Sequence, residues 1–213
     1  IRGAIASETA LMAVVKADAY GHGAISVARS ALDAGANWLG VATIPEGIEL
    51  REAGITTPIL VLGATYTPAQ LRAVVHWQLQ ATLCMPKQAL VFSETLAELG
   101  QSLPVHLKID TGMSRLGVLW REAAEFVQLV RRLPYLEIAS VYSHLATADD
   151  RDPREMQRQH QRFQEAIARI RATGFAPPRL HLANSAATLR DRALHYDMVR
   201  VGLAIYGLYP AEH

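Results

Sequence analysis

Two patterns of hydrophobic and polar positions alternate along the whole chain. Short runs rich in Val, Ile and Leu are separated by longer segments in which apolar residues recur every three or four positions. Short, uninterrupted apolar runs are typical of parallel strands covered on both faces, and the longer pattern is typical of helices that bury one face. Eight strands are therefore expected, at residues 12–18, 38–43, 58–63, 79–84, 105–110, 137–144, 179–184 and 199–207.

Several of the intervening helices have recognisable ends. Thr67 followed by Pro68 predicts a helix start, because threonine is a good N-cap and proline is favoured at the first helical position. A second helix is predicted from Asp152-Pro153 to a C-terminal cap at Gly174, and a third over residues 120–133. Their buried faces are expected to be Met156, Phe163, Ile167 and Ile170 in the second, and Ala123, Phe126, Val127 and Val130 in the third.

Eight strands in strict alternation with about seven helices favour a (β/α)8 barrel of the TIM type. The alternative is an open, doubly wound parallel sheet. No linker or low-complexity segment interrupts the pattern, so one domain is expected over residues 1–213. The chain begins with Ile1 and stops soon after the eighth strand, so we expect it to be shortened at both ends.

Composition narrows the function classes. Half of the residues are hydrophobic and the formal net charge is +1, which does not favour a nucleic-acid-binding protein. No apolar run approaches the roughly 18 to 20 residues that span a bilayer, and the start has no signal-peptide pattern. One cysteine, Cys84, leaves no internal disulfide, and no metal-binding spacing is present. A cytoplasmic protein without a metal is expected.

In a barrel, chemistry gathers where strands end, and polar residues occur at those positions here. Lys16 follows the first strand. A buried lysine loses proton affinity, and its neutral amine can form a Schiff base with a carbonyl compound. The alternative is a lysine that extends to solvent. Tyr20, four residues later, either packs or donates its hydroxyl to a phosphate.

The seventh and eighth strands suggest an anion site. Asn184 and Ser185 precede the expected start of a helix, where Ser185 is either a simple N-cap or a phosphate ligand. Gly202 follows Arg200 on the neighbouring strand. Barrel phosphate sites commonly use the loops after these two strands.

The fifth and sixth strands add three candidates. Asp110, Thr111 and Gly112 are explained by turn chemistry, and Arg115 is either a surface charge or a site residue. A turn does not explain Lys108, which lies inside an apolar strand. His144, at the end of the sixth strand, is either structural or part of the site.

Five motifs, taken in order, resemble those of alanine racemases over nearly the whole chain. "MAVVKADAYGHG" resembles the pyridoxal-phosphate attachment signature of that family. "KIDTGMSRLG", "SHLATAD", "HLANSAATL" and "VRVGLAIYG" resemble further blocks. The resemblance implies an isomerase that interconverts L- and D-alanine through a Schiff base with pyridoxal 5'-phosphate, and so supplies D-alanine for peptidoglycan.

The resemblance also implies a role for individual residues. Lys16 matches the lysine that binds the cofactor covalently and acts as one of two acid/base groups, and Arg115 matches an arginine near the substrate. Arg200 matches the arginine that faces the pyridine nitrogen, and Lys108 matches a lysine that is carbamylated in some members. The remaining matches to cofactor-binding positions are Tyr20, Leu62, His144, Asn184, Ser185, Gly202 and Leu203.

The family's second acid/base group is a tyrosine on a C-terminal β domain, which reaches across a homodimer. This chain stops before such a domain, so we expect it to bind the cofactor and not to racemise alanine at a useful rate alone. The alternative is a single-domain, non-enzymatic pyridoxal-phosphate homeostasis barrel. The length of this chain favours the homeostasis barrel, and its motifs favour the racemase.

Overall fold

A computed structural model describes residues 1–210, so the last three residues of the expected domain lie outside the described part. All strand pairs are parallel. The strands are β1 (Ala10–Val14), β2 (Trp38–Val41), β3 (Ile59–Ala64), β4 (Gln80–Leu83), β5 (Leu103–Asp110), β6 (Val118–Leu119), β7 (Leu136–Tyr142), β8 (Leu180–His181) and β9 (Met198–Val201).

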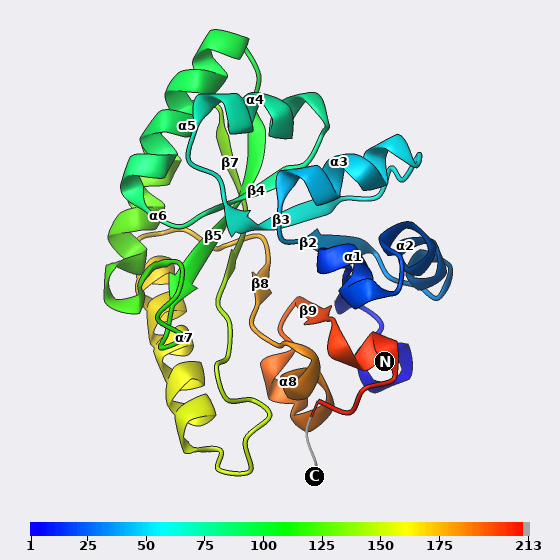
Figure 1. The fold of residues 1–213 in the computed structure, drawn as a ribbon. Helices are drawn as coiled ribbons and strands as arrows, with labels where there is room; N and C mark the ends of the chain where they lie inside the picture. The colour runs from blue at the N-terminus through cyan, green and yellow to red at the C-terminus, as the bar shows by residue number, and fades with distance from the viewer. Residues whose placement is uncertain (211–213) are drawn as a thin grey trace.

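Eight of these strands close into a barrel (Figure 1). Their order is β4-β3-β2-β1-β9-β8-β7-β5, and a further pairing of β4 with β5 completes the ring, while the two-residue β6 adds only to β5. In an open sheet two strands of this ring would be edges. The (β/α)8 prediction is therefore confirmed, and the doubly wound alternative is wrong.

Helices surround the strands on the outside of the barrel (Figure 1). They are α1 (Lys16–Gly21), α2 (Ala24–Asp33), α3 (Ile44–Glu52), α4 (Pro68–His76), α5 (Pro86–Leu99), α6 (Ala123–Arg132), α7 (Arg154–Ala172) and α8 (Ser185–Arg190). Short 3-10 turns are η1 (Arg2–Ala4), η2 (Trp120–Glu122), η3 (Arg192–Leu194) and η4 (Leu203–Tyr206). Thr67 caps α4 as predicted, with Gln70 completing a capping box. Both predicted apolar faces, on α6 and α7, are buried.

Several strand predictions extend too far, including those at 38–43 and 179–184, whose strands end at Val41 and His181. β1 ends at Val14, and Lys16 begins the helical turn α1. β7 ends at Tyr142, so His144 lies in the following loop. The run at 199–207 leaves the sheet after Val201, and its later apolar residues pack against the core from η4. A short apolar run does not distinguish a strand from a turn that buries one side, which explains these errors.

The interior of the barrel has an apolar half. Met12, Trp38, Leu60 and Met198 form a buried cluster there, separate from the larger core between strands and helices. Within residues 1–210, no helix is long and apolar enough to cross a membrane.

Candidate active site

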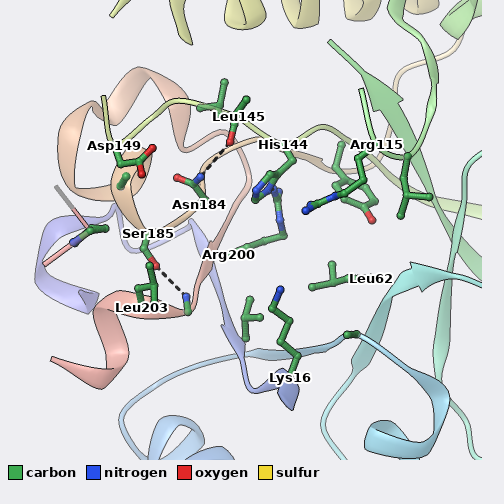
Figure 2. A pocket seen from close by; sticks show the side chains of 18 of the residues that line it. Lys16, Leu62, Arg115, His144, Leu145, Asp149, Asn184, Ser185, Arg200 and Leu203 are labelled. Atoms are coloured by element: carbon green, nitrogen blue, oxygen red, sulfur yellow. Dashed lines mark hydrogen bonds between the residues drawn. The ribbon is translucent and has the colours of Figure 1, made fainter. Parts of the chain in front are cut away.

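A cavity of about 450 Å³ opens at the carboxyl ends of the barrel strands (Figure 2). This is a typical volume for a site that takes a small ligand. Every residue singled out from the sequence as a site residue lines it. These residues are Lys16, Tyr20, Leu62, Lys108, Arg115, His144, Asn184, Ser185, Arg200, Gly202 and Leu203.

Lys16 is positioned by a turn of unusual handedness. The four residues after it, 17–20, have φ between 49° and 56°, which is left-handed helical backbone. Such backbone costs non-glycine residues about 1–2 kcal/mol each. Asp18 supports the turn, since its Oδ1 accepts a hydrogen bond of 2.7 Å from the backbone N–H of Ala24. Lys16 itself is half-buried, and its Nζ lies 5.8 Å from the centre of the Tyr20 ring.

Glu46, at the start of α3, holds the same turn against the end of the neighbouring strand β2. Its carboxylate accepts hydrogen bonds from the backbone N–H groups of Ala17 at 2.9 Å, Ala42 at 2.6 Å and Thr43 at 3.1 Å. Bonds to an ionised acceptor are stronger than neutral ones. The loop that carries Lys16 is therefore fastened to the end of β2.

The structure distinguishes the N-cap of α8 from the candidate phosphate ligand. Asn184, not Ser185, is the N-cap of α8, and its Oδ1 accepts from the backbone N–H of Ala187 at 3.0 Å. The N-cap interpretation of Ser185 is therefore wrong. Its hydroxyl is free to face the cavity, where Oγ accepts from the backbone N–H groups of Gly202 at 3.0 Å and Ala204 at 3.3 Å.

Gly202 leaves room for a group beside these donors. A Cβ at position 202 would lie 2.9 Å from the hydroxyl oxygen of Tyr20. The hydroxyls of Tyr20 and Ser185 and the backbone after β9 thus surround one small polar space. This donor set suits a phosphate.

Arg200 lies buried below the mouth of the cavity (Figure 2). Its Nη2 donates to the carbonyls of Ser143 at 2.8 Å and Leu182 at 3.2 Å, and Nη1 lies 3.0 Å from His181 Nδ1. Burial lowers the pKa of Arg200 to about 10, so the guanidinium stays charged at neutral pH. Burial and then the Arg200 charge lower the pKa of His144 to about 2, so this imidazole stays neutral.

Lys108 is, like Arg200, a buried cation of the cavity. Burial, followed by the charge of Arg200, lowers its pKa to about 7. Among residues 1–210 no ion pair joins Lys108 to a carboxylate. Asp110 is engaged elsewhere, because its Oδ1 accepts from the backbone N–H groups of Gly112 at 2.9 Å and Ser114 at 3.0 Å.

The charge of the lining favours an anion. Lys16, Lys108, Arg115 and Arg200 contribute four basic side chains, against one lining carboxylate, that of the exposed Asp149. An excess of cations in a concave site attracts and orients a negatively charged ligand. A phosphorylated or carboxylate-bearing small molecule meets this requirement.

Sequence reasoning missed two polar side chains of the lining, those of Tyr142 and Asp149. Tyr142 lies two positions before His144, and alternation along the strand was the available signal for its inward direction. Its buried hydroxyl bonds to Thr82 Oγ1 at 2.9 Å, and burial raises its pKa. Asp149 lies in an irregular loop with no such periodic signal.

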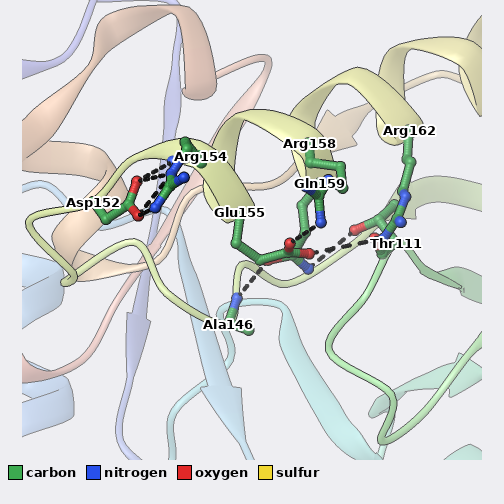
Figure 3. A network of polar contacts seen from close by, with 8 residues as sticks. All are labelled: Thr111, Ala146, Asp152, Arg154, Glu155, Arg158, Gln159 and Arg162. Carbon is green, nitrogen blue, oxygen red and sulfur yellow. Dashed lines mark hydrogen bonds and ion pairs between the residues drawn. The ribbon is translucent and has the colours of Figure 1, made fainter.

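Gln159 of α7 was also missed, because it lies outside the cavity. Figure 3 shows this side chain between two loops that carry site residues. Its Oε1 accepts from the backbone N–H of Ala146 at 2.8 Å, and Nε2 donates to the carbonyl of His144 at 3.2 Å and to Thr111 Oγ1 at 3.4 Å. Arg162, one turn further, donates to the carbonyl of Thr111 at 2.9 Å. The long helix α7 therefore joins the loops after β5 and β7.

Comparison with known proteins identifies the family of the chain. The family described as alanine racemase, N-terminal domain, matches residues 1–210. The chain belongs to this family. Among curated alanine racemases it is 67% identical to one from a Nostoc species over 98% of the chain, and 61% identical to one from a Synechocystis species over 98%.

Solved alanine racemases have the same fold. One from Clostridium difficile in complex with cycloserine has a TM-score of 0.95 at 32% identity and covers 99% of the chain. One from Bacillus anthracis with bound L-Ala-P has a TM-score of 0.92 at 36% identity over 99%. The chain spans 55% and 56% of the two cyanobacterial relatives, and 58% and 54% of these two solved chains.

Proposed function

We propose that this chain is the pyridoxal-phosphate-binding barrel of an alanine racemase. The observation that carries the proposal is the convergence of Lys16, the Tyr20–Ser185–Gly202 space and Arg200 on one cavity at the carboxyl ends of the strands. The racemase relatives at 67% and 61% identity support it. They do not favour the alternative of a non-enzymatic homeostasis barrel.

The residues present fit the cofactor. The space beside Gly202, which a Cβ would fill against Tyr20, is bordered by the hydroxyls of Tyr20 and Ser185. Ser185 Oγ accepts from the backbone N–H of Gly202, so its own hydroxyl hydrogen would be available to the phosphate. Lys16 Nζ would hold the aldehyde carbon, and Arg200 would face the ring nitrogen. When bound, pyridoxal phosphate supplies an electron sink that stabilises negative charge at the substrate α-carbon.

The chain's own groups account for part of the reaction. Lys16 would take up and return the proton of the α-carbon on one face, and Arg115 would orient the substrate carboxylate by charge-assisted hydrogen bonds. The charged Arg200 would keep the ring nitrogen unprotonated, which limits charge spread into the ring.

Inversion needs a second proton carrier on the opposite face. We propose that this group is a tyrosine of a β domain in a homodimeric whole protein, as the family resemblance implies. The proposal includes a cytoplasmic location and a role in supplying D-alanine for peptidoglycan. The chain alone would exchange the α-proton of alanine with retention and would racemise it poorly.

A labelling experiment tests the cofactor assignment. The chain has three lysines, Lys16, Lys87 and Lys108, besides its terminal amine. Pyridoxal phosphate fixed with borohydride should be recovered on the Lys16 peptide alone, and Lys16→Ala should abolish it. Lys87→Ala, at an exposed position, is the matched control. Recovery of the label on Ile1, Lys87 or Lys108 in the unaltered chain would refute the assignment.

A further inference from the structure

A hydrogen-bonded chain of polar side chains crosses the interior of the barrel beneath the cavity. It takes one residue from each of five adjacent strands, β4, β5, β7, β8 and β9. In order these are Gln80, His106, Ser140, His181 and Arg200. The four links measure 2.6 Å from Gln80 Oε1 to His106 Nε2, 2.7 Å from His106 Nδ1 to Ser140 Oγ, 2.9 Å from Ser140 Oγ to His181 Nε2, and 3.0 Å from His181 Nδ1 to Arg200 Nη1.

This chain lies one level below the lining of the cavity. His106 pairs in register with Ser140, and the next inward-facing pair along the same two strands is Lys108 with Tyr142. The Tyr142 ring stacks on His181 with ring centres 4.5 Å apart and an interplanar angle of 7°. His106, Ser140 and His181 are fully buried and do not line the cavity themselves.

Arg200 sets the direction of both bonds that His181 makes. A guanidinium only donates, so His181 Nδ1 must accept from Arg200 and carry no proton. The proton of a neutral His181 then lies on Nε2 and is donated to Ser140 Oγ. The Ser140 hydroxyl in turn donates to His106 Nδ1, and His106 Nε2–H donates to Gln80 Oε1.

The opposite direction at Ser140 is less favourable. If His106 donated from Nδ1, Ser140 would receive two protons and its own hydroxyl hydrogen would lack an acceptor within residues 1–210. A buried donor without a partner costs about 1–3 kcal/mol. One orientation therefore satisfies all five side chains.

Both imidazoles are held neutral. Burial, with the charge of Arg179, lowers the pKa of His106 to about 3. Burial and the neighbouring Arg200 lower the pKa of His181 well below its usual value. No second proton enters either ring near neutral pH, so the direction of the bonds is preserved.

We propose that Gln80, His106 and Ser140 are positioning residues for Arg200, acting through a one-way hydrogen-bond relay that locks His181 as its Nε2–H tautomer. The acceptor at His181 Nδ1 then holds one amino group of the guanidinium while the carbonyls of Ser143 and Leu182 hold the other. The consequence for cofactor affinity rests on the proposed function, and the tautomer assignment does not.

Nitrogen NMR of the chain labelled with ¹⁵N-histidine tests the relay without any ligand. His106 and His181 should each show a protonated Nε2 and an unprotonated Nδ1, assigned with His106→Gln and His181→Gln. Ser140→Ala should convert one or both rings to a mixture of tautomers, and Ser140→Thr, which keeps the hydroxyl, should restore the single form. A protonated Nδ1 on either ring of the unaltered chain would overturn the proposal.

Two further variants distinguish loss of the relay from a general loss of packing as the cause of a spectral change. Ser93→Ala removes another buried serine hydroxyl, which lies on helix α5 and donates to the carbonyl of Pro134 at 2.9 Å, with no bond to the relay. It should leave both tautomers unchanged. Gln80→Ala, at a half-buried position, should disturb His106 even if Ser140→Ala does not fold. Unchanged spectra in both folded relay variants would reject the relay.

Pyridoxal-phosphate titration supplies the functional arm. Ser140→Ala should raise the dissociation constant roughly three- to tenfold, the effect of one displaced hydrogen bond, with Ser93→Ala unchanged. Equal affinities in Ser140→Ala and the unaltered chain would reject the positioning role. If the unaltered chain shows the expected tautomers and binds no cofactor, the proposed function fails and the relay stands.

Discussion

The Nζ atom of Lys108 lies 4.6 Å from the centre of the Tyr142 ring, over the face of a fully buried aromatic side chain. This cation–π contact attracts the ammonium group of Lys108, and no carboxylate among residues 1–210 forms an ion pair with it. Burial therefore disfavours the charged form of Lys108.

In CO₂-free buffer, the free energy of unfolding should rise with pH between about 7 and 10. The folded pKa of Lys108 is about 7 and the unfolded value is about 10.4, so the unfolded chain binds more protons across this window. The slope is at most about 1.4 kcal/mol per pH unit. Urea titrations of the chain and of Lys108→Met should differ by this slope, and parallel curves would contradict the lowered pKa.

Lys108 should react with CO₂. Its neutral amine forms a carbamate by making one N–C bond and losing one proton, and the resulting anion would face Arg115 and Arg200 rather than repel them. Bicarbonate should raise the melting temperature and add the mass of one CO₂ in native mass spectrometry. Lys108→Met should show neither change. An unmodified mass in saturating bicarbonate would exclude the carbamate.

Ala17→Gly should stabilise the chain by about 0.5–1 kcal/mol. Ala17 is exposed with φ of 52°, and glycine removes a left-handed penalty that exceeds its own entropic cost. The matched control is Ala168→Gly, at an exposed position inside the right-handed helix α7, which should destabilise by about 1 kcal/mol. Chemical denaturation measures both, and destabilisation by both variants would show that the left-handed turn is absent in solution.

Gly202→Ala should weaken pyridoxal-phosphate binding about tenfold or more, because the new Cβ would meet the Tyr20 hydroxyl at 2.9 Å. Gly3→Ala, where nothing lies within 4 Å of the added atom, is the control. Spectroscopic titration gives the affinities, and thermal melts verify folding. Equal binding by the two variants would place the phosphate elsewhere.

Glu46→Gln should destabilise the chain by about 1–2 kcal/mol and slow the reaction of Lys16 with pyridoxal phosphate. The amide loses the charge that accepts three backbone N–H groups around the Lys16 loop. Glu49→Gln, exposed on the same helix, should change neither quantity. If the two variants react at the same rate, Glu46 does not position the loop.

The sequence predicted the barrel and the main cavity lining because both depend on short-range patterns. Apolar runs predicted the strands, Lys16 and Ser185 followed predicted strands, and Arg200 lay within the eighth. The left-handed turn after Lys16 was not predictable in the same way, since residues 17–20 contain no glycine and their backbone is set by contacts with Glu46 and Ala24. The relay from Gln80 to Arg200 joins residues up to 120 positions apart, and only the strand register brings them together.

The pairing of β1 with β9 joins residues 10–13 to residues 198–201, almost the two ends of the described chain. Contacts of such long sequence separation form late, because the loop entropy must be overcome first. During synthesis the ring stays open until its last strand has emerged, and two unpaired strand edges remain available to other chains. Lys16 and Gly202 flank this seam, so a nascent barrel cannot assemble its ligand site before it closes. If the chain binds pyridoxal phosphate as proposed, binding would require the closed ring, and free pyridoxal phosphate should favour completed folding by trapping the closed form.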